Sequence, residues 1–295
     1  MASIERVLVL GAGWVGRQVA ARMARYGVTV WLVDRQTDVC QAALAWMQQL
    51  DHFDADPQWL QRVHIAGSIQ ELSASEQSID LVLESVPEQL SLKKRVLRQA
   101  SELFSAPTII ASNSSYFVPS VLSEFVADSS RFAHWHFHVP VLNDSVVDIV
   151  GCEATNKEVL DRLQELTLRI GQIPLMLRRE HPGYVFNWLL QSVLKSALEL
   201  AALDVADPID IDRSWTAVTG MPLGPFAIMD RIGLDVIEQV LSNSRWAEPT
   251  TVPVDELLAL LSQHTSQGEF GEKTGRGFYA YTLHPSSSNV GHVGL

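Results

Sequence analysis

Three histidines alternate with aromatic residues in the segment His134-Trp-His-Phe-His138. Alternate side chains of a β-strand share one face, so the three rings would line one side of a strand. Imidazole both transfers protons near neutral pH and binds metals, and such a row could hold zinc or copper. A fourth metal ligand is not obvious from the sequence.

A glycine-rich turn near the start of the chain, Gly11-Ala-Gly-Trp-Val-Gly16, has the spacing G-x-G-x-x-G. It lies between a short apolar run and a helical pattern, and Asp34 closes the next apolar run, as in dinucleotide-binding proteins. Gly11 permits the tight turn, Gly13 lets a pyrophosphate approach the backbone, and Gly16 lets the helix pack on the sheet. Asp34 can bind ribose hydroxyls and would repel a 2′-phosphate, which predicts NAD. Arg35 instead favours NADP, because an arginine at this position can bind the 2′-phosphate.

The elements that must position these residues alternate between strand and helix. Short apolar runs predict strands at 6–10, 28–33, 80–84, 108–111, 131–138 and 146–150. Helical periodicity follows at 17–26, at 37–50 and after residue 88. This alternation predicts an α/β fold with an N-terminal Rossmann-type, doubly wound parallel sheet.

The pattern becomes helical after Pro182, and apolar helices are predicted over 184–203, 209–219 and 226–241. We therefore expect an NAD-binding Rossmann domain over residues 1–181 and an all-helical domain for substrate binding and dimerisation over residues 182–295. Few charges surround the first of these helices. Such a helix is normally buried, here partly against a second subunit.

The composition narrows the possible partners. The formal net charge of −12 argues against nucleic acid or an anionic membrane as the main partner. Two cysteines, Cys40 and Cys152, suggest no disulfide framework, which favours a reducing compartment and a cytoplasmic location. No apolar run reaches the ~18 residues of a membrane helix. The apolar residues 7–10 meet a glycine turn too early for a signal peptide.

Seven sequence blocks occur in a fixed order along almost the whole chain. They are Gly11–Gly16 with Asp34, Glu84-Ser-Val-Pro-Glu88 with Lys93, Ser112-Asn-Ser-Ser115, Arg131-Phe-Ala-His-Trp-His-Phe137, Pro182-Gly-Tyr-Val-Phe-Asn187, Met221-Pro-Leu-Gly-Pro-Phe226 and Gly271-Glu-Lys-Thr-Gly-Arg-Gly-Phe-Tyr279. In this order they resemble the L-3-hydroxyacyl-CoA dehydrogenase family, including its diketoreductase-like and lambda-crystallin or L-gulonate dehydrogenase-like branches. The later blocks resemble the family's E-x-x-x-E-x-x-x-x-K, N-T-S-S, R-F-A-G-x-H-F, P-G-F-x-x-N, P-x-G-P-F and G-x-K-T-G-x-G-F-Y.

The resemblance implies that His136 is the catalytic acid/base, taking a proton from a 3-hydroxyl during oxidation and returning it during reduction. The family pairs this histidine with a glutamate at the position of Asp148. Aspartate is one methylene shorter, so we expect the pair to need a small backbone shift or a bridging water. His134 or His138 could tune the charge of His136. The resemblance also implies a metal-free site.

Further roles follow from the same resemblance. Ser114 and Asn187 would hydrogen-bond the reacting oxygens of the substrate or order the site. Glu88, Lys93, Ser114 and Lys273 would contact the cofactor. For Glu88 and Lys93, a plain ion pair at a helix start, with one partner solvated, is the alternative.

Two departures from the family leave the substrate open. The family commonly reads H-F-F-N-P, and its asparagine is Val139 here, with Asn143 the candidate replacement. The segment from 41 to 64 has no lysine but contains Asp51, Asp54 and Asp56, where the family carries serine and lysine contacts to CoA.

Three hypotheses follow. The first is an NAD-dependent 3-hydroxyacyl-CoA dehydrogenase, as in fatty acid metabolism. The second is the same chemistry on a small CoA-free 3-hydroxy or 3-oxo acid or ketone. The third is a non-catalytic, crystallin-like NAD(H)-binding protein. A small-molecule substrate and a homodimer are expected for either enzyme.

Overall fold

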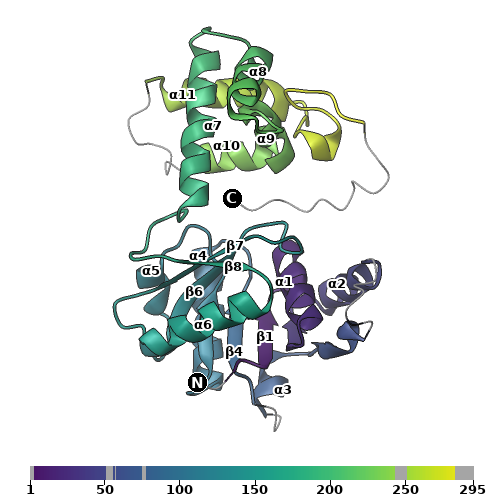
Figure 1. The fold of residues 1–295 in the computed structure, drawn as a ribbon, viewed down its shortest axis with the longest axis vertical. Coiled ribbons are helices and arrows are strands. Elements are labelled where there is room, and N and C mark those ends of the chain that lie inside the picture. Colours follow the sequence, from purple (N-terminus) through teal and green to yellow (C-terminus); the bar gives the residue numbers. More distant parts are fainter. Residues whose placement is uncertain (1–2, 51–55, 57, 75–77, 243–250, 283–295) are drawn as a thin grey trace. The chain divides into compact units, whose positions relative to one another are not determined.

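The computed structural model describes residues 3–50, 56, 58–74, 78–242 and 251–282 (Figure 1). The chain divides into two compact units, Met1–Tyr184 and Val185–Leu295. The first unit therefore extends beyond the boundary predicted after residue 181. The physical reason is a turn that stays with the sheet, because Gly183 donates its backbone N–H to the carbonyl of Ser115.

The first unit is built on one sheet of eight strands in the order β3-β2-β1-β4-β5-β6-β7-β8. The strands are β1 (Arg6–Leu10), β2 (Thr29–Val33), β3 (Val63–Ile65), β4 (Leu81–Glu84), β5 (Ile109–Ser112), β6 (Phe132–Phe137), β7 (Val146–Gly151) and β8 (Ile173–Met176). This is the predicted Rossmann-type sheet, with one correction. β7 runs antiparallel to β6, whereas the other neighbouring pairs are parallel. The loop between β6 and β7 holds no helix, and a parallel pairing would need a longer crossover.

Helices cover both faces of the sheet, as Figure 1 shows. One face packs against α1 (Trp14–Arg25), α2 (Thr37–Gln48) and α6 (Lys157–Arg169). The other packs against α3 (Ile69–Ala74), α4 (Leu90–Leu103) and α5 (Pro119–Ser123). Burial on both faces explains why the central strands read as continuous apolar runs. Two 3₁₀ turns, η1 (Trp59–Arg62) and η2 (Ser129–Arg131), precede β3 and β6.

The second unit is helical, as predicted. It contains α7 (Phe186–Ala202), α8 (Pro208–Thr219), α9 (Pro225–Ile232), α10 (Leu234–Ser242), α11 (Val254–Thr265) and the turn η3 (Glu272–Thr274). The helix expected over 226–241 is broken at Gly233, whose φ of +108° suits glycine and ends α9. Within the described ranges, no helix combines the length and apolar character needed to cross a membrane.

Candidate active site

Polar side chains gather on one face of the sheet, where the parallel strands β4, β5 and β6 end. Glu84 in β4 pairs in register with Ser112 in β5, which pairs with His134 in β6. Two residues further along β6, His136 lies directly opposite Asp148 of β7. The carboxyl ends of parallel strands are the usual ligand-binding edge of such a sheet. The topology thus brings the predicted catalytic histidine to that edge.

His136 and Asp148 touch directly. The Nδ1 atom of His136 lies 3.0 Å from Oδ2 of Asp148, and the two side chains are 3% and 0% exposed. A bridging water is therefore not needed, and the expected backbone shift stays a prediction. Residues directly opposite in an antiparallel pair have Cβ atoms only about 5 Å apart, so a short carboxylate reaches the ring.

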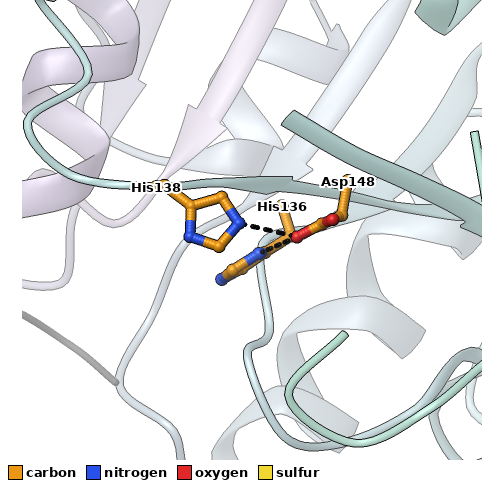
Figure 2. A group of neighbouring side chains, drawn as sticks. All are labelled: His136, His138 and Asp148. Atoms are coloured by element: carbon orange, nitrogen blue, oxygen red, sulfur yellow. Dashed lines mark hydrogen bonds and ion pairs between the residues drawn. The ribbon is translucent and has the colours of Figure 1, made fainter. Parts of the chain in front are cut away.

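A second ring shares this carboxylate. Nε2 of His138 lies 2.8 Å from the same Oδ2 atom of Asp148 (Figure 2). Burial raises the pKa of Asp148, but the hydrogen bonds from His136 and His138 outweigh it and hold that pKa below its usual value. An ionised carboxylate only accepts hydrogen bonds, so both nitrogens donate to it. Neutral His136 therefore carries its proton on Nδ1 and presents an unprotonated Nε2.

The same three residues, His136, His138 and Asp148, offer ligand atoms within 4.8 Å of one another, which is close enough to hold a metal ion. Figure 2 shows both ring nitrogens directed at one carboxylate oxygen. Two hydrogen bonds onto that oxygen already account for the arrangement. A metal-free site stays our prediction.

The serine beside His136 is Ser115. Its Oγ lies 3.0 Å from Nε2 of His136 and donates to that nitrogen in the tautomer derived above. Ser114, the predicted serine, instead donates its hydroxyl to Glu88 at 2.6 Å. The predicted contacts of Ser114 with substrate and cofactor stay predictions, and its selection as the serine nearest His136 reflects the alignment used. When Asn113 rather than Ser112 is matched to the asparagine of N-T-S-S, Ser115 falls on the first serine of that motif.

Tyr184 is a site residue that the sequence analysis missed. Its ring stacks on the ring of His136, with centroids 4.6 Å apart. Its hydroxyl donates to the carbonyl of Ser114 at 2.6 Å and lies 2.7 Å from Nδ1 of His134. The signal was available, because His134 and Tyr184 replace the glycine and phenylalanine of the family motifs. The two departures contact each other and together support one side of His136.

Burial dominates the charge state of the histidines on β6. It lowers the pKa of His136 below its usual value, although hydrogen bonding to Asp148 opposes that shift. Burial, with Lys93 nearby, lowers the pKa of His134 further. His136 is therefore neutral near pH 7, which suits a group that must accept a proton.

A buried ion pair lies next to this site. Nζ of Lys93 lies 2.7 Å from Glu84 and 3.2 Å from Glu88, and the Lys93 side chain is 1% exposed. Burial would lower the pKa of Lys93, but the two carboxylates outweigh it and raise that pKa. The alternative of a plain ion pair at the start of α4, with one partner solvated, agrees with this contact, because Lys93 is buried whereas the side chain of Glu88 is 34% exposed. The predicted cofactor contacts of Glu88 and Lys93 stay predictions.

The glycine turn has the shape expected of a pyrophosphate site. Gly11 has a φ of +102°, and a Cβ there would lie 2.5 Å from the carbonyl oxygen of Ser85. A Cβ on Gly16 would lie 1.9 Å from the carbonyl oxygen of Gly11. A Cβ on Gly13 would meet no described atom within 4 Å, so the backbone there is open to a ligand. Gly13 also begins α1, and no side chain caps that helix end. The turn therefore fits a dinucleotide phosphate.

Asp34 lies beside this turn, as predicted. Its Oδ2 accepts the backbone N–H of Ala12 at 3.0 Å, and its Oδ1 accepts that of Gln36. These bonds hold the carboxylate at the end of β2, where the ribose of a dinucleotide would lie.

The remaining predicted residues lie in the second unit or in an exposed loop. Asn187 lies in α7 and Lys273, bonded to Asp235, lies in η3, both in the second unit. Their contacts with substrate and cofactor stay predictions. Asn143 is exposed in the loop after β6, so its replacement of the asparagine lost at Val139 also stays a prediction.

The family assignment rests on two matched domain models. The NAD-binding domain of 3-hydroxyacyl-CoA dehydrogenase matches residues 6–180, and the C-terminal domain of that enzyme matches residues 183–281. The chain belongs to the 3-hydroxyacyl-CoA dehydrogenase family. It is an NAD-dependent oxidoreductase that acts on a small-molecule substrate. The hypothesis of a non-catalytic protein loses one of the two departures that motivated it, because Asp148 reaches His136 directly, whereas the departure at Val139 remains.

Relatives within the 3-hydroxyacyl-CoA dehydrogenase family differ in substrate. The mitochondrial hydroxyacyl-coenzyme A dehydrogenase of Sus scrofa is 28% identical, over 94% of this chain and 91% of its own length. The 5-formyl-3-hydroxy-2-methylpyridine 4-carboxylate 5-dehydrogenase of Mesorhizobium japonicum is 27% identical, over 95% of this chain and 91% of its own. A solved diketoreductase acting on dicarbonyl compounds is 33% identical with a TM-score of 0.84, and the match covers 95% of this chain and 100% of that one.

Proposed function

We propose that the protein interconverts a 3-hydroxyacyl group, carried as a CoA thioester, and its 3-oxo form, with His136 as the acid/base. The observation that supports this proposal is the hydrogen-bonded chain from Asp148 through His136 to Ser115. A buried carboxylate fixes the proton on Nδ1, and the opposite nitrogen faces a hydroxyl group. This is the arrangement that a general base needs.

In the oxidation direction, Nε2 of His136 takes the proton of the 3-hydroxyl group as the carbonyl forms. Asp148 stabilises the resulting imidazolium, since a carboxylate within hydrogen-bond distance favours the charged ring. Ser115 can donate a hydrogen bond to the substrate oxygen as charge develops there. The glycine turn and Asp34 would hold NAD⁺, which would accept the hydride that leaves C3 of the substrate. Reduction reverses each step.

A second candidate is the same chemistry on a small CoA-free acid or ketone. Arg62 is the single lysine or arginine between residues 41 and 64, and it is bound to Asp56 at 2.6 Å. Asp51 and Asp54 lie outside the described residues. A segment with one engaged cation and several carboxylates is a poor partner for the phosphates of CoA. The relatives that act on a dicarbonyl compound and on a pyridine carboxylate also support this candidate.

A substrate panel separates the two candidates. NADH oxidation is measured with acetoacetyl-CoA, with acetoacetate and with its ethyl ester. The proposal expects turnover of the thioester at a higher kcat/KM than of either small compound. Turnover of the ester or free acid without turnover of the thioester would establish the second candidate instead. If none of the three is reduced although NADH binds, both candidates are wrong.

We also infer a homodimer built on the helical unit. Helices α7 and α8 expose several large apolar side chains, namely Phe186, Trp188, Leu189, Leu200, Ile209 and Val218. A monomer rarely leaves so much apolar surface in water. Light scattering at micromolar concentration should give about twice the chain mass of 32.7 kDa. A mass equal to one chain would contradict the inference.

A further inference from the structure

The carboxylate of Asp148 depends on two imidazole rings for its hydrogen bonds. Both bonds end on Oδ2, one from His136 and one from His138. The other oxygen, Oδ1, is buried without a hydrogen-bond partner within the described part of the chain. The side chain of Asp148 is 0% exposed, so water does not replace either ring. A buried charge held by only two donors is sensitive to the loss of one.

We propose that His138 is a positioning residue, which holds Asp148 in place and divides its negative charge between two rings. This inference rests on the proposed function, because it assigns His138 a role in setting the basicity of His136. Two departures from the family pattern meet in this contact, since His138 stands where the family has phenylalanine and Asp148 where it has glutamate. The second ring thus anchors the shorter carboxylate.

His138, rather than His134, has this role. His134 uses its Nδ1 atom on the hydroxyl of Tyr184 and has no bond to Asp148. The ring of His138 meets that of His136 at 4.7 Å, edge to face, and both nitrogens approach one oxygen atom. The ionisable groups that act on His136 are Asp148 of β7, His138 just after β6 and Glu88 before α4. His134 of β6 also interacts with His136, and Tyr184 before α7 stacks on its ring.

Because His136 and His138 share the carboxylate of Asp148, protonation of one ring affects protonation of the other. A proton on one ring draws the charge of Asp148 toward that ring and disfavours a proton on the other. After burial, His138 is therefore a further cause that lowers the pKa of His136. Without the second ring, the whole carboxylate charge would act on His136, and the pKa of His136 would rise.

The test uses two variants of one residue. His138→Phe removes the donor and the titrating group. His138→Gln keeps an N–H donor but cannot be charged. The imidazole signals of the NAD⁺-bound protein are followed by ¹⁵N NMR as a function of pH. EDTA treatment beforehand removes metal ions, so that the signals report proton binding alone. The spectrum of His136→Gln identifies the signal of His136. We expect the titration midpoint of His136 to rise by about one pH unit in His138→Phe, and by less in His138→Gln.

The pH profile of turnover gives a second readout. Oxidation needs neutral His136, so the rising limb of the kcat/KM profile should move to higher pH in His138→Phe. In His138→Gln the limb should lie between those of the unchanged protein and of His138→Phe. An unchanged or lower midpoint in both variants would overturn the proposal. Should His138→Phe fail to fold, His138→Gln decides alone, and an unchanged or lower midpoint of His136 in that variant would overturn the proposal. The NMR titration needs no turnover, so a failed substrate panel leaves this result readable.

Discussion

Replacement of His136 by glutamine is expected to lower kcat/KM for the proposed substrate by about 10²–10⁴-fold. The glutamine amide can still hydrogen-bond Asp148 or Ser115, but it cannot carry a proton to or from the substrate oxygen. The loss should be large in both directions, because one nitrogen serves as base and as acid. Initial rates of NADH oxidation with the substrate identified by the panel measure it.

The matched control is the same substitution at His64, His64→Gln. His64 is exposed in β3 and stacks on Trp31, away from the strands that carry the site. It should keep the unchanged protein's kcat/KM, and both variants should bind NADH normally by fluorescence. If His136→Gln retains turnover within a few-fold of the unchanged protein, the acid/base assignment is wrong.

Much of the fold follows from local patterns. The strand at 6–10, the glycine turn and Asp34 are set by residues close in sequence, where apolar runs and positive-φ glycines have few alternatives. Two strands were missed for physical reasons. β3 has only three residues, and β8 is at most half-buried and contains Pro174, so neither gives a clear apolar signal.

The site was harder to predict because it depends on register and on loop direction. The direct bond between Asp148 and His136 requires β7 to turn back beside β6, which a parallel interpretation of the sheet hides. The choice between Ser114 and Ser115 depends on which of two adjacent hydroxyls faces the ring, and a one-residue shift reverses it. Tyr184 meets His136 from a turn far along the chain. Spacing along the chain does not show these contacts, and only the comparison with the family motifs could have pointed to Ser115 and Tyr184.

The buried ion pair gives the largest expected effect on stability. Lys93→Met should lower the free energy of unfolding of the first unit by about 3–5 kcal/mol, because it leaves the fully buried Glu84 without its cation. Methionine fits the space but supplies no donor to the carboxylate. The free energy of unfolding is measured by hydrogen exchange in urea. Peptides from β4 and β5 are followed, because they report on this unit alone.

The adjacent residue provides the control. Lys94→Met makes the same change at a half-buried lysine whose Nζ lies 4.2 Å from the ring centre of Phe125, and it should cost at most about 1 kcal/mol. Equal decreases in the free energy of unfolding of the two variants would show that the buried ion pair does not stabilise the unit more than the half-buried lysine does.

The pH dependence of the Lys93→Met effect follows from the two shifted groups. The pKa of Lys93 is raised above 10.5, so its contribution is complete below that value and is lost as the pH rises through the raised pKa. Burial would raise the pKa of Glu88, but the charge of Lys93 and hydrogen bonds lower it below 4.5. The contribution of Glu88 is therefore present above 4.5 and lost as the pH falls through the lowered pKa. The difference between Lys93→Met and the unchanged protein should be widest between these limits and narrow toward both. A difference that stays constant across this range would mean that packing, rather than charge, makes Lys93 important.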